Sequence, residues 1–292
     1  MKVLITGGTG YLGQRLVRLF DAKGWDIGLI ARAADTKAAS DRADNHVYFH
    51  NDLDGIRKAC SQDWELVIHA ATNYGREKNN DLKPILEANL EVPLRMLKCL
   101  SENGSKALFI NVDTSLPRNT NYYSLSKKQL LDWVPMIGKS VRWLNVSLEY
   151  FYGPGDADWK FITMLVRKMI NNETEIPLSK GNQERDFIYI DDLISSFEII
   201  VENRNSFQKK IENIALGSGK AVSLKELSIL IARILGYPLE GLKFGAIPTR
   251  KNEVLHSVAD TEAIKSLGWE NQHTLEEGLK LMIDLESKYK SR

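Results

Sequence analysis

The sequence has few residues that could build a metal site or a disulfide framework. Its 292 residues include two cysteines and five histidines. Cys60 and Cys99 are isolated, without a CxxC pair, and the histidines show no HExxH or other ligand spacing. Structural zinc sites and disulfide-rich scaffolds both need several cysteines or histidines at characteristic spacings. We therefore expect no structural disulfide and no bound metal.

An excess of one charge and long apolar runs are missing too. The 39 basic residues are matched by 38 acidic ones, without a long block of one sign, which argues against a general nucleic-acid binder. No apolar run approaches the roughly 18 residues of a membrane-spanning helix. The run in MKVLITGG is only about three residues, whereas a secretory signal needs about 7–15. We predict a cytoplasmic protein with neither nucleic acid nor membrane as a partner.

Strands and helices alternate along the first half of the chain. The strand-length apolar runs are KVLITG, DIGLIAR, HVYFHND, WELVIHAAT, KALFINV and SVRWLNV. After the first run, Leu12, Leu16 and Phe20 recur at helical spacing. Pro93 lies within the helical stretch DLKPILEANLEVPLRMLKCLSENG and should kink or divide it. Apolar strands separated by helices predict an α/β fold with a doubly wound parallel sheet of the Rossmann type.

The character of the chain changes after the GPG tripeptide at 153–155. Beyond it the elements are shorter and lose the regular alternation. We predict a Rossmann domain for NAD(P) over residues 1–152. Residues 153–292 are predicted to form mainly a smaller mixed α/β substrate domain, with late Rossmann elements interleaved as an alternative.

The stretch TGGTGYLG follows the first predicted strand directly and opens a helix. Glycines allow a sharp turn and a close approach of the backbone to a pyrophosphate, and the helix N-terminus offers free N–H groups. The expected cofactor-binding residues are Gly7, Gly10, Tyr11, Leu12 and Gly13. The alternative is a glycine-rich turn that binds nothing.

The end of the second strand bears on which cofactor binds. NAD needs an acidic side chain there for the adenosine ribose, whereas NADP needs a cation for the 2′-phosphate. The strand ends in LIAR, so Arg32 occupies this place and can bind a phosphate bidentately. We expect NADP(H) to be preferred, with NAD still possible; the alternative is a solvated surface arginine.

Tyr123 and Lys127 in NYYSLSKKQ are four residues apart, so on a helix they share a face. A free phenol has a pKa near 10 and is a poor acid or base at neutral pH. An adjacent ammonium lowers that pKa, which would make Tyr123 a usable proton donor. The alternative is an ordinary core helix.

The GxxGxxG spacing in TGGTGYLG resembles the extended short-chain dehydrogenase/reductase family, the group of sugar-nucleotide epimerases and dehydratases. The YxxxK spacing agrees with this resemblance. The resemblance implies that Lys127 also binds the nicotinamide ribose. It further implies that Thr114, at the end of KALFINVDTS, holds the substrate oxygen, with Ser115 as a substitute. Further cofactor contacts are implied at Asp52, Leu53, Ala70, Ala71 and Thr72.

The resemblance extends over essentially the whole chain. In the family, arginines like Arg185 in RDFIYIDD and Arg250 in AIPTRKNE meet the diphosphate of a nucleotide-sugar substrate. Two guanidiniums suit that task because each can bind bidentately. The alternative for each arginine is a surface salt bridge. The resemblance also implies a homodimer, formed through the helices after the fourth and fifth strands.

The residues around Thr114 restrict the range of reactions that the protein could catalyse. Ser115 and Leu116 follow it, where dehydratases carry an acidic pair. The stretches FINVDTSLPRNTNYYSLSKKQ and LEYFYGPGDAD resemble CDP-abequose synthases, nucleotide-sugar 4-ketoreductases of O-antigen synthesis. The expected function is NADPH-dependent reduction of the 4-keto group of a nucleotide-linked deoxyhexose. An NAD-dependent 4-epimerase and a non-catalytic NADP-sensing regulator remain as alternatives.

Overall fold

The computed structural model describes residues 1–32, 46–76, 81–137, 141–208, 211–250 and 252–290. The chain divides into two compact units. The first unit comprises Met1–Ser147 and Phe197–Ile214, and the second comprises Leu148–Ser196 and Ala215–Arg292. The sequence predicted a boundary after residue 152. Within the described residues, no helix has the length and apolar character required to cross a membrane.

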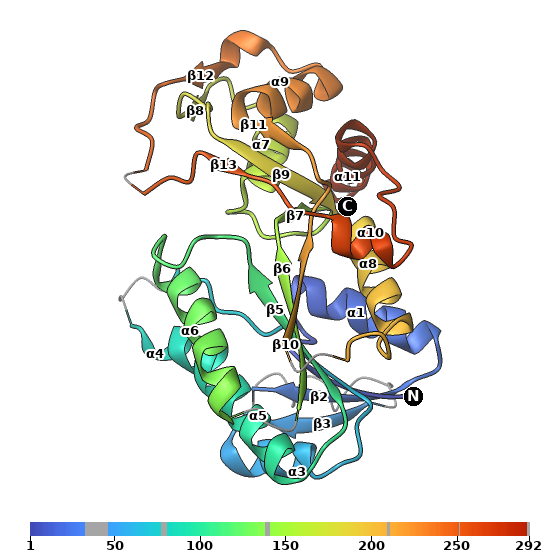
Figure 1. The fold of residues 1–292 in the computed structure, drawn as a ribbon. Coiled ribbons are helices and arrows are strands. Elements are labelled where there is room, and N and C mark those ends of the chain that lie inside the picture. Colours follow the sequence, from blue (N-terminus) through green and yellow to red (C-terminus); the bar gives the residue numbers. More distant parts are fainter. Residues whose placement is uncertain (33–45, 77–80, 138–140, 209–210, 251, 291–292) are drawn as a thin grey trace. The chain divides into compact units, whose positions relative to one another are not determined.

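A seven-stranded sheet forms the centre of the first unit (Figure 1). Its strands run in the order β10-β6-β5-β4-β1-β2-β3. β1 pairs in parallel with β2 and β4, and the pairs β2–β3 and β4–β5 are parallel as well. The chain builds outward from β1 to β3 and then crosses to β4 on the other side of β1. This reversal confirms the predicted Rossmann topology, and ligands of such sheets bind at the carboxyl ends of the strands beside it. The strands are β1 (Lys2–Thr6), β2 (Asp26–Ala31), β3 (Val47–His50), β4 (Leu66–His69), β5 (Leu108–Thr114), β6 (Arg142–Leu148) and β10 (Ile211–Leu216).

Helices cover both faces of this sheet (Figure 1). α3, α5 and α6 pack on one face, where Ile56, Met96 and Leu130 share a buried cluster with Phe109 and Trp143 of the strands. α1 lies on the opposite side. The helical segments that belong wholly or partly to this unit are α1 (Tyr11–Ala22), α3 (Leu53–Cys60), α4 (Lys83–Leu86), the π-helix η1 (Glu87–Glu91), α5 (Val92–Glu102), α6 (Tyr122–Ile137) and α8 (Ile190–Glu202).

The predicted irregularity at Pro93 takes the form of a π-helix. The chain stays helical from α4 to α5, but η1 widens the turn immediately before Pro93, the second residue of α5. Proline has no N–H to donate, and its ring crowds the carbonyl four residues earlier. A single wider turn removes both conflicts without ending the helix.

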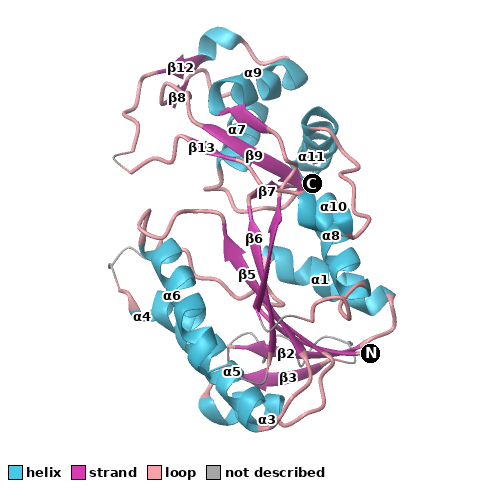
Figure 2. Ribbon diagram, in the orientation of Figure 1, coloured by secondary structure: helices cyan, strands magenta, loops and turns pink. Residues whose placement is uncertain are grey.

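The second unit is a smaller mixed α/β structure, as predicted (Figure 2). Its main sheet centres on β9, which pairs antiparallel with β11 and parallel with β7 and β13; β8 and β12 form a separate parallel pair. The elements are β7 (Tyr150–Tyr152), α7 (Phe161–Ile170), β8 (Ile176–Leu178), β9 (Glu184–Tyr189), β11 (Ala221–Ser223), α9 (Leu224–Leu235), η2 (Leu239–Gly241), β12 (Leu242–Phe244), β13 (His256–Ser257), α10 (Glu262–Ser266) and α11 (Leu275–Lys290).

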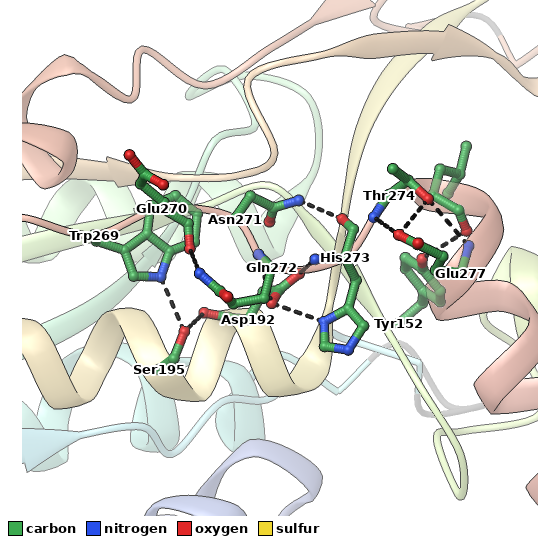
Figure 3. A network of polar contacts seen from close by, with 11 residues as sticks. Tyr152, Asp192, Ser195, Trp269, Glu270, Asn271, Gln272, His273, Thr274 and Glu277 are labelled. Carbon is green, nitrogen blue, oxygen red and sulfur yellow. Dashed lines mark hydrogen bonds and ion pairs between the residues drawn. The ribbon is translucent and has the colours of Figure 1, made fainter.

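A buried carboxylate secures the segment that leads into α11 (Figure 3). Asp192 of α8 accepts hydrogen bonds from the backbone N–H groups of Gln272 and His273, each at 3.1 Å. The His273 ring lies 2.9 Å from the same carboxylate through Nδ1. The Trp269 indole donates to the Ser195 hydroxyl, one turn along α8. Asp192 thus fixes a stretch that has no regular structure of its own.

Candidate active site

The glycine-rich turn leaves a helix N-terminus open at the carboxyl end of β1. α1 begins at Tyr11, and its cap residue Gly10 offers no side-chain hydrogen bond. The first turn of α1 also contains no acidic residue. The first N–H groups of a helix have no partner within it, and together with the helix dipole they favour an anion. This end of α1 can therefore hold a phosphate group, and the binding of a cofactor there remains a prediction.

Two positions in the turn accept only glycine. Gly7 has φ +75°, and a Cβ there would lie 2.5 Å from the backbone nitrogen of Ala71. A Cβ on Gly13 would overlap the carbonyl oxygen of Gly7. The turn is therefore packed directly on the chain that leaves β4, which brings Gly7 together with the predicted residues Ala70 and Ala71. Thr72 follows them, half-buried.

The ends of β1 and β4 are joined by a buried hydrogen-bond group. The Thr6 hydroxyl accepts from the Ala71 N–H and lies 2.8 Å from Nδ1 of His69. Burial, and then the positive charge of Lys127, hold the pKa of His69 well below its usual value. His69 is therefore neutral at physiological pH and acts as a hydrogen-bonding group within the sheet.

The predicted residues at β2 and β3 occupy different environments. Arg32 follows β2 and is exposed. Asp52 is the N-cap of α3, and its carboxylate accepts from the Gly55 N–H at 2.7 Å. Leu53 is 44% exposed at the start of α3. The Asp52 side chain thus has a structural task already, and the cofactor contacts of all three remain predictions.

Lys127 is completely buried where β4 and β5 end. Its ammonium donates to the carbonyl oxygen of Val112 at 2.9 Å and to that of Ala71 at 3.4 Å. Burial lowers the pKa of Lys127 to about 8; the Asp113 carboxylate opposes this change and the Lys128 ammonium adds to it. The charge is thus held by carbonyl dipoles at the strand ends, beside the glycine-rich turn.

Tyr123 lies one turn before Lys127 on the same helix. α6 begins at Tyr122, and the Asn121 side chain accepts from the Ser124 N–H at 2.8 Å, which fixes this start. The Tyr123 ring packs against the ring of Tyr74, with centroids 4.9 Å apart, whereas Tyr122 is 63% exposed. Of the two adjacent tyrosines, Tyr123 is therefore the one packed into the first unit.

Thr114 is the last residue of β5, two positions beyond the carbonyl that Lys127 binds. Its side chain is almost buried, and its hydroxyl oxygen accepts from the Leu116 N–H at 3.2 Å. A hydroxyl that accepts one hydrogen bond still has its own proton to donate. Thr114, Tyr123 and Lys127 thus lie on two packed elements, β5 and α6, and Thr114 can offer a proton to a carbonyl oxygen.

Asn89 is a site residue that sequence reasoning missed. It lies in η1 and is buried. Its amide exchanges hydrogen bonds with both backbone groups of Asn73, at 2.9 and 2.8 Å, and donates to the Ser126 hydroxyl of α6 at 3.0 Å. Asn89 thereby fixes the segment that presents Tyr74 to Tyr123. The available signal was a polar residue on the apolar face of EANLEVP, immediately before Pro93.

The two predicted substrate arginines belong to the second unit. Arg185 of β9 is buried, with its guanidinium 2.5 Å from the Glu253 carboxylate and donating to the Glu184 carbonyl. Arg250 is exposed, three residues before Glu253. Arg185 is thus already paired within the protein, and binding of a diphosphate by either arginine remains a prediction. Across the described part of the chain, no group of three or more His, Cys, Asp or Glu side chains could hold a metal ion.

Comparison with known proteins places these features in context. Residues 3–215 match the model of the NAD dependent epimerase/dehydratase family. The chain is 28% identical to the CDP-abequose synthase of Salmonella muenchen, with 97% of each chain covered. It is 23% identical to the UDP-glucose 4-epimerase of Corynebacterium glutamicum, with 94% of this chain and 92% of the relative covered.

Solved structures share the fold at lower identity. The UDP-glucose 4-epimerase of Thermotoga maritima with UDP-glucose superposes with a TM-score of 0.81 at 22% identity, covering 99% of both chains. The UDP-glucose 4-epimerase of Thermus thermophilus in complex with NAD gives a TM-score of 0.80 at 18% identity, covering 98% of this chain and 99% of the other.

Proposed function

Because the chain belongs to the NAD dependent epimerase/dehydratase family, we propose that it reduces the 4-keto group of a nucleotide-activated deoxyhexose with NADPH. The observation that carries the proposal is the placement of Lys127 and Thr114 at the end of β5, with Tyr123 on the same face of α6 as Lys127. This set can protonate and orient a carbonyl oxygen. The likeness to CDP-abequose synthases supports the choice of sugar chemistry.

Thr114, Tyr123 and Lys127 have different tasks in this proposal. The nicotinamide, when bound, supplies the hydride. Thr114 donates a hydrogen bond to the substrate oxygen and Tyr123 delivers the proton. Lys127 binds the ribose and, through its charge, stabilises the phenolate that Tyr123 becomes. The cradle fits a dinucleotide, because Gly7 and Gly13 let the turn pack tightly on the chain after β4 and on itself, which leaves the N-terminus of α1 accessible to a pyrophosphate.

The reductase is favoured over a dehydratase by the surroundings of Thr114. Ser115 and Leu116 follow Thr114, so the acidic pair of a dehydratase is missing there. The carboxylate that precedes it, Asp113, is buried against Lys128. Elimination of water would need an acid and a base that this strand end does not offer to a substrate.

NADP(H) is the proposed cofactor because Arg32 stands at the end of β2. An exposed guanidinium there can bind the 2′-phosphate bidentately. The second candidate is an NAD-dependent 4-epimerase, which is favoured by the likeness to UDP-glucose 4-epimerases, one of them solved with NAD.

The proposed substrate carries a diphosphate, with Arg185 and Arg250 as its ligands. Since Arg185 is paired with Glu253, binding through Arg185 requires the guanidinium to exchange a carboxylate for a phosphate. Both are oxyanions that suit a bidentate guanidinium.

We also propose a homodimer formed through α4 and α6. α6 exposes Trp133 and Met136, at 49% and 69%, and α4 exposes Leu86 at 44%. Large apolar side chains exposed on two neighbouring helices are typical of an interaction surface, and a second copy of the chain would cover them.

The proposal is tested by NADPH and NADH oxidation against a panel of CDP-, dTDP-, GDP- and UDP-linked 4-keto deoxyhexoses. We expect turnover with NADPH on at least one of them. Tyr123→Phe should lower kcat by about 10²–10⁴, the usual effect of losing a general acid, while NADPH still binds. Tyr122→Phe is the matched control, since Tyr122 is exposed. Full activity in Tyr123→Phe would refute the mechanism, and release of NAD⁺ from the denatured protein would favour the epimerase.

A further inference from the structure

Both backbone polar groups of Thr114 are bound by side chains. The Thr114 N–H donates to Oδ1 of Asp113 at 2.7 Å, and its carbonyl oxygen accepts from the Lys128 ammonium at 2.6 Å. The register of β5 with β4 ends at Asn111, three residues earlier. Beyond that point β5 is no longer paired with β4, so the side chains of Asp113 and Lys128 supply hydrogen bonds to the backbone of Thr114 in its place.

The two side chains also bind each other. The Lys128 ammonium lies 2.7 Å from Oδ2 of Asp113, whose side chain is completely buried, while that of Lys128 is 22% exposed. Asn145 of β6 donates to the same carboxylate oxygen at 3.0 Å and accepts from Asn111 at 2.8 Å. A carboxylate and an ammonium that are removed from water are stable only when hydrogen bonds and the opposite charge replace their hydration.

We propose that Lys128 and Asp113 are positioning residues that together clamp the backbone N–H and carbonyl groups of Thr114 and so aim its hydroxyl at the substrate oxygen; this inference rests on the proposed function. Among the residues that the structure describes, the Leu116 N–H is the one group that restrains the hydroxyl itself. Its direction therefore depends on where the Thr114 backbone is held.

The two adjacent lysines of α6, Lys127 and Lys128, thereby have different roles. Lys127 donates to the carbonyl of Val112 and Lys128 to that of Thr114. These carbonyls lie two residues apart on β5 and therefore point to the same edge of the strand. Consecutive lysines of α6 thus bind consecutive carbonyls of that edge. Lys127 belongs to the proposed active site, and Lys128 belongs to the clamp on Thr114.

The clamp is tested by Lys128→Met, which keeps an unbranched side chain one atom shorter and removes the ammonium. Displacement of a catalytic group by about 1 Å costs on the order of 10²-fold in rate, so we expect kcat to fall by about 10- to 100-fold. The Kd for NADPH should change by less than about threefold, since the lost interaction acts on the chemical step. Lys128→Arg, which can still pair with Asp113, should recover most of kcat.

The matched control is Lys98→Met on α5, whose side chain is 67% exposed and ion-paired at 3.9 Å. It makes the same chemical change without touching β5 and should leave kcat unchanged. A wild-type kcat in Lys128→Met would overturn the inference. So would a loss that Lys128→Arg does not restore, because that result would indicate general damage to the fold.

Deuterium exchange at the Thr114 amide separates this inference from the proposed function. Exchange should be faster in Lys128→Met than in Lys98→Met, because the carboxylate that binds the amide loses its counter-ion. Equal exchange in the two variants would overturn the clamp. If the wild-type protein reduced no 4-keto sugar, the proposed function would fail, and exchange would still decide whether Thr114 is clamped.

Discussion

Replacing Lys127 by methionine should remove a distinct pH dependence from the free energy of unfolding of the cofactor-free protein. Lys127 is completely buried, and burial lowers its pKa from 10.5 to about 8. The charges that face it are those of Asp113 and Lys128, while His69 nearby is neutral. In the unfolded chain the ammonium is hydrated, so its pKa returns to 10.5.

The sign and size of this pH dependence of the free energy of unfolding follow from proton linkage. Below about pH 8 Lys127 is protonated in both states, so the cost of burying its charge is constant. Between about pH 8 and 10.5 the folded protein releases this proton while the unfolded chain keeps it. Stability therefore rises with pH across this window. At about 1.4 kcal/mol for each pH unit, the gain is about 3 kcal/mol.

Urea unfolding at a series of pH values measures this gain. Fluorescence can report on the first unit alone if Trp159 and Trp269 are replaced by phenylalanine, because the other tryptophans belong to that unit. The free-energy difference between wild type and Lys127→Met should move by about 3 kcal/mol in favour of wild type from about pH 7 to 10.5. Leu130→Ala, an uncharged change on the buried face of α6, should give a difference that is independent of pH.

A constant difference between wild type and Lys127→Met over this range would refute the reasoning. It would mean that Lys127 titrates at the same pH in the folded and the unfolded protein. The ammonium would then be hydrated rather than held by the carbonyl oxygens of Val112 and Ala71.

Three further predictions concern other parts of the chain. Gly13→Ala should weaken NADPH binding by at least about tenfold in a fluorescence titration, because its Cβ would displace Gly7 from the cradle; unchanged affinity would contradict that packing. Asp192→Ala should destabilise the second unit by about 1–3 kcal/mol, since the partly buried N–H groups of Gln272 and His273 lose their carboxylate partner. The exposed Asp191→Ala should cost little in the same urea titration. Trp133→Glu should convert the proposed dimer into monomers in sedimentation, and a wild-type monomer would rule out the dimer.

Local patterns were sufficient to predict the fold. Apolar strands separated by helical periods, with glycines after the first strand, specify a doubly wound sheet because each pattern acts within one element. The same local reasoning paired Tyr123 with Lys127, since the two residues are four apart on one helix. The π-helix before Pro93 was foreseen only as an irregularity, because its form depends on how the neighbouring turns pack.

Long-range contacts could not be predicted from the sequence. Asn89 meets Asn73 and Ser126 across 16 and 37 residues. Nothing in the local pattern of either partner marks such a contact. Arg185 was predicted to meet a diphosphate, with a surface salt bridge as the alternative, and the structure shows it buried against Glu253, 68 residues away. A buried guanidinium needs a counter-ion within the fold, and only the folded chain shows which carboxylate supplies it.

The sequence by itself determined the Rossmann sheet, the glycine-rich cradle and the tyrosine–lysine pair, because periodicity and short spacings encode them. The tertiary structure decided how the neighbouring groups are used. It placed Lys127 at the carbonyls where β4 and β5 end, and it joined Lys128 to Asp113 across 15 residues. Each of these contacts depends on how α6 packs against the sheet. That packing is determined by burial of the whole helix face, which a local sequence pattern does not specify.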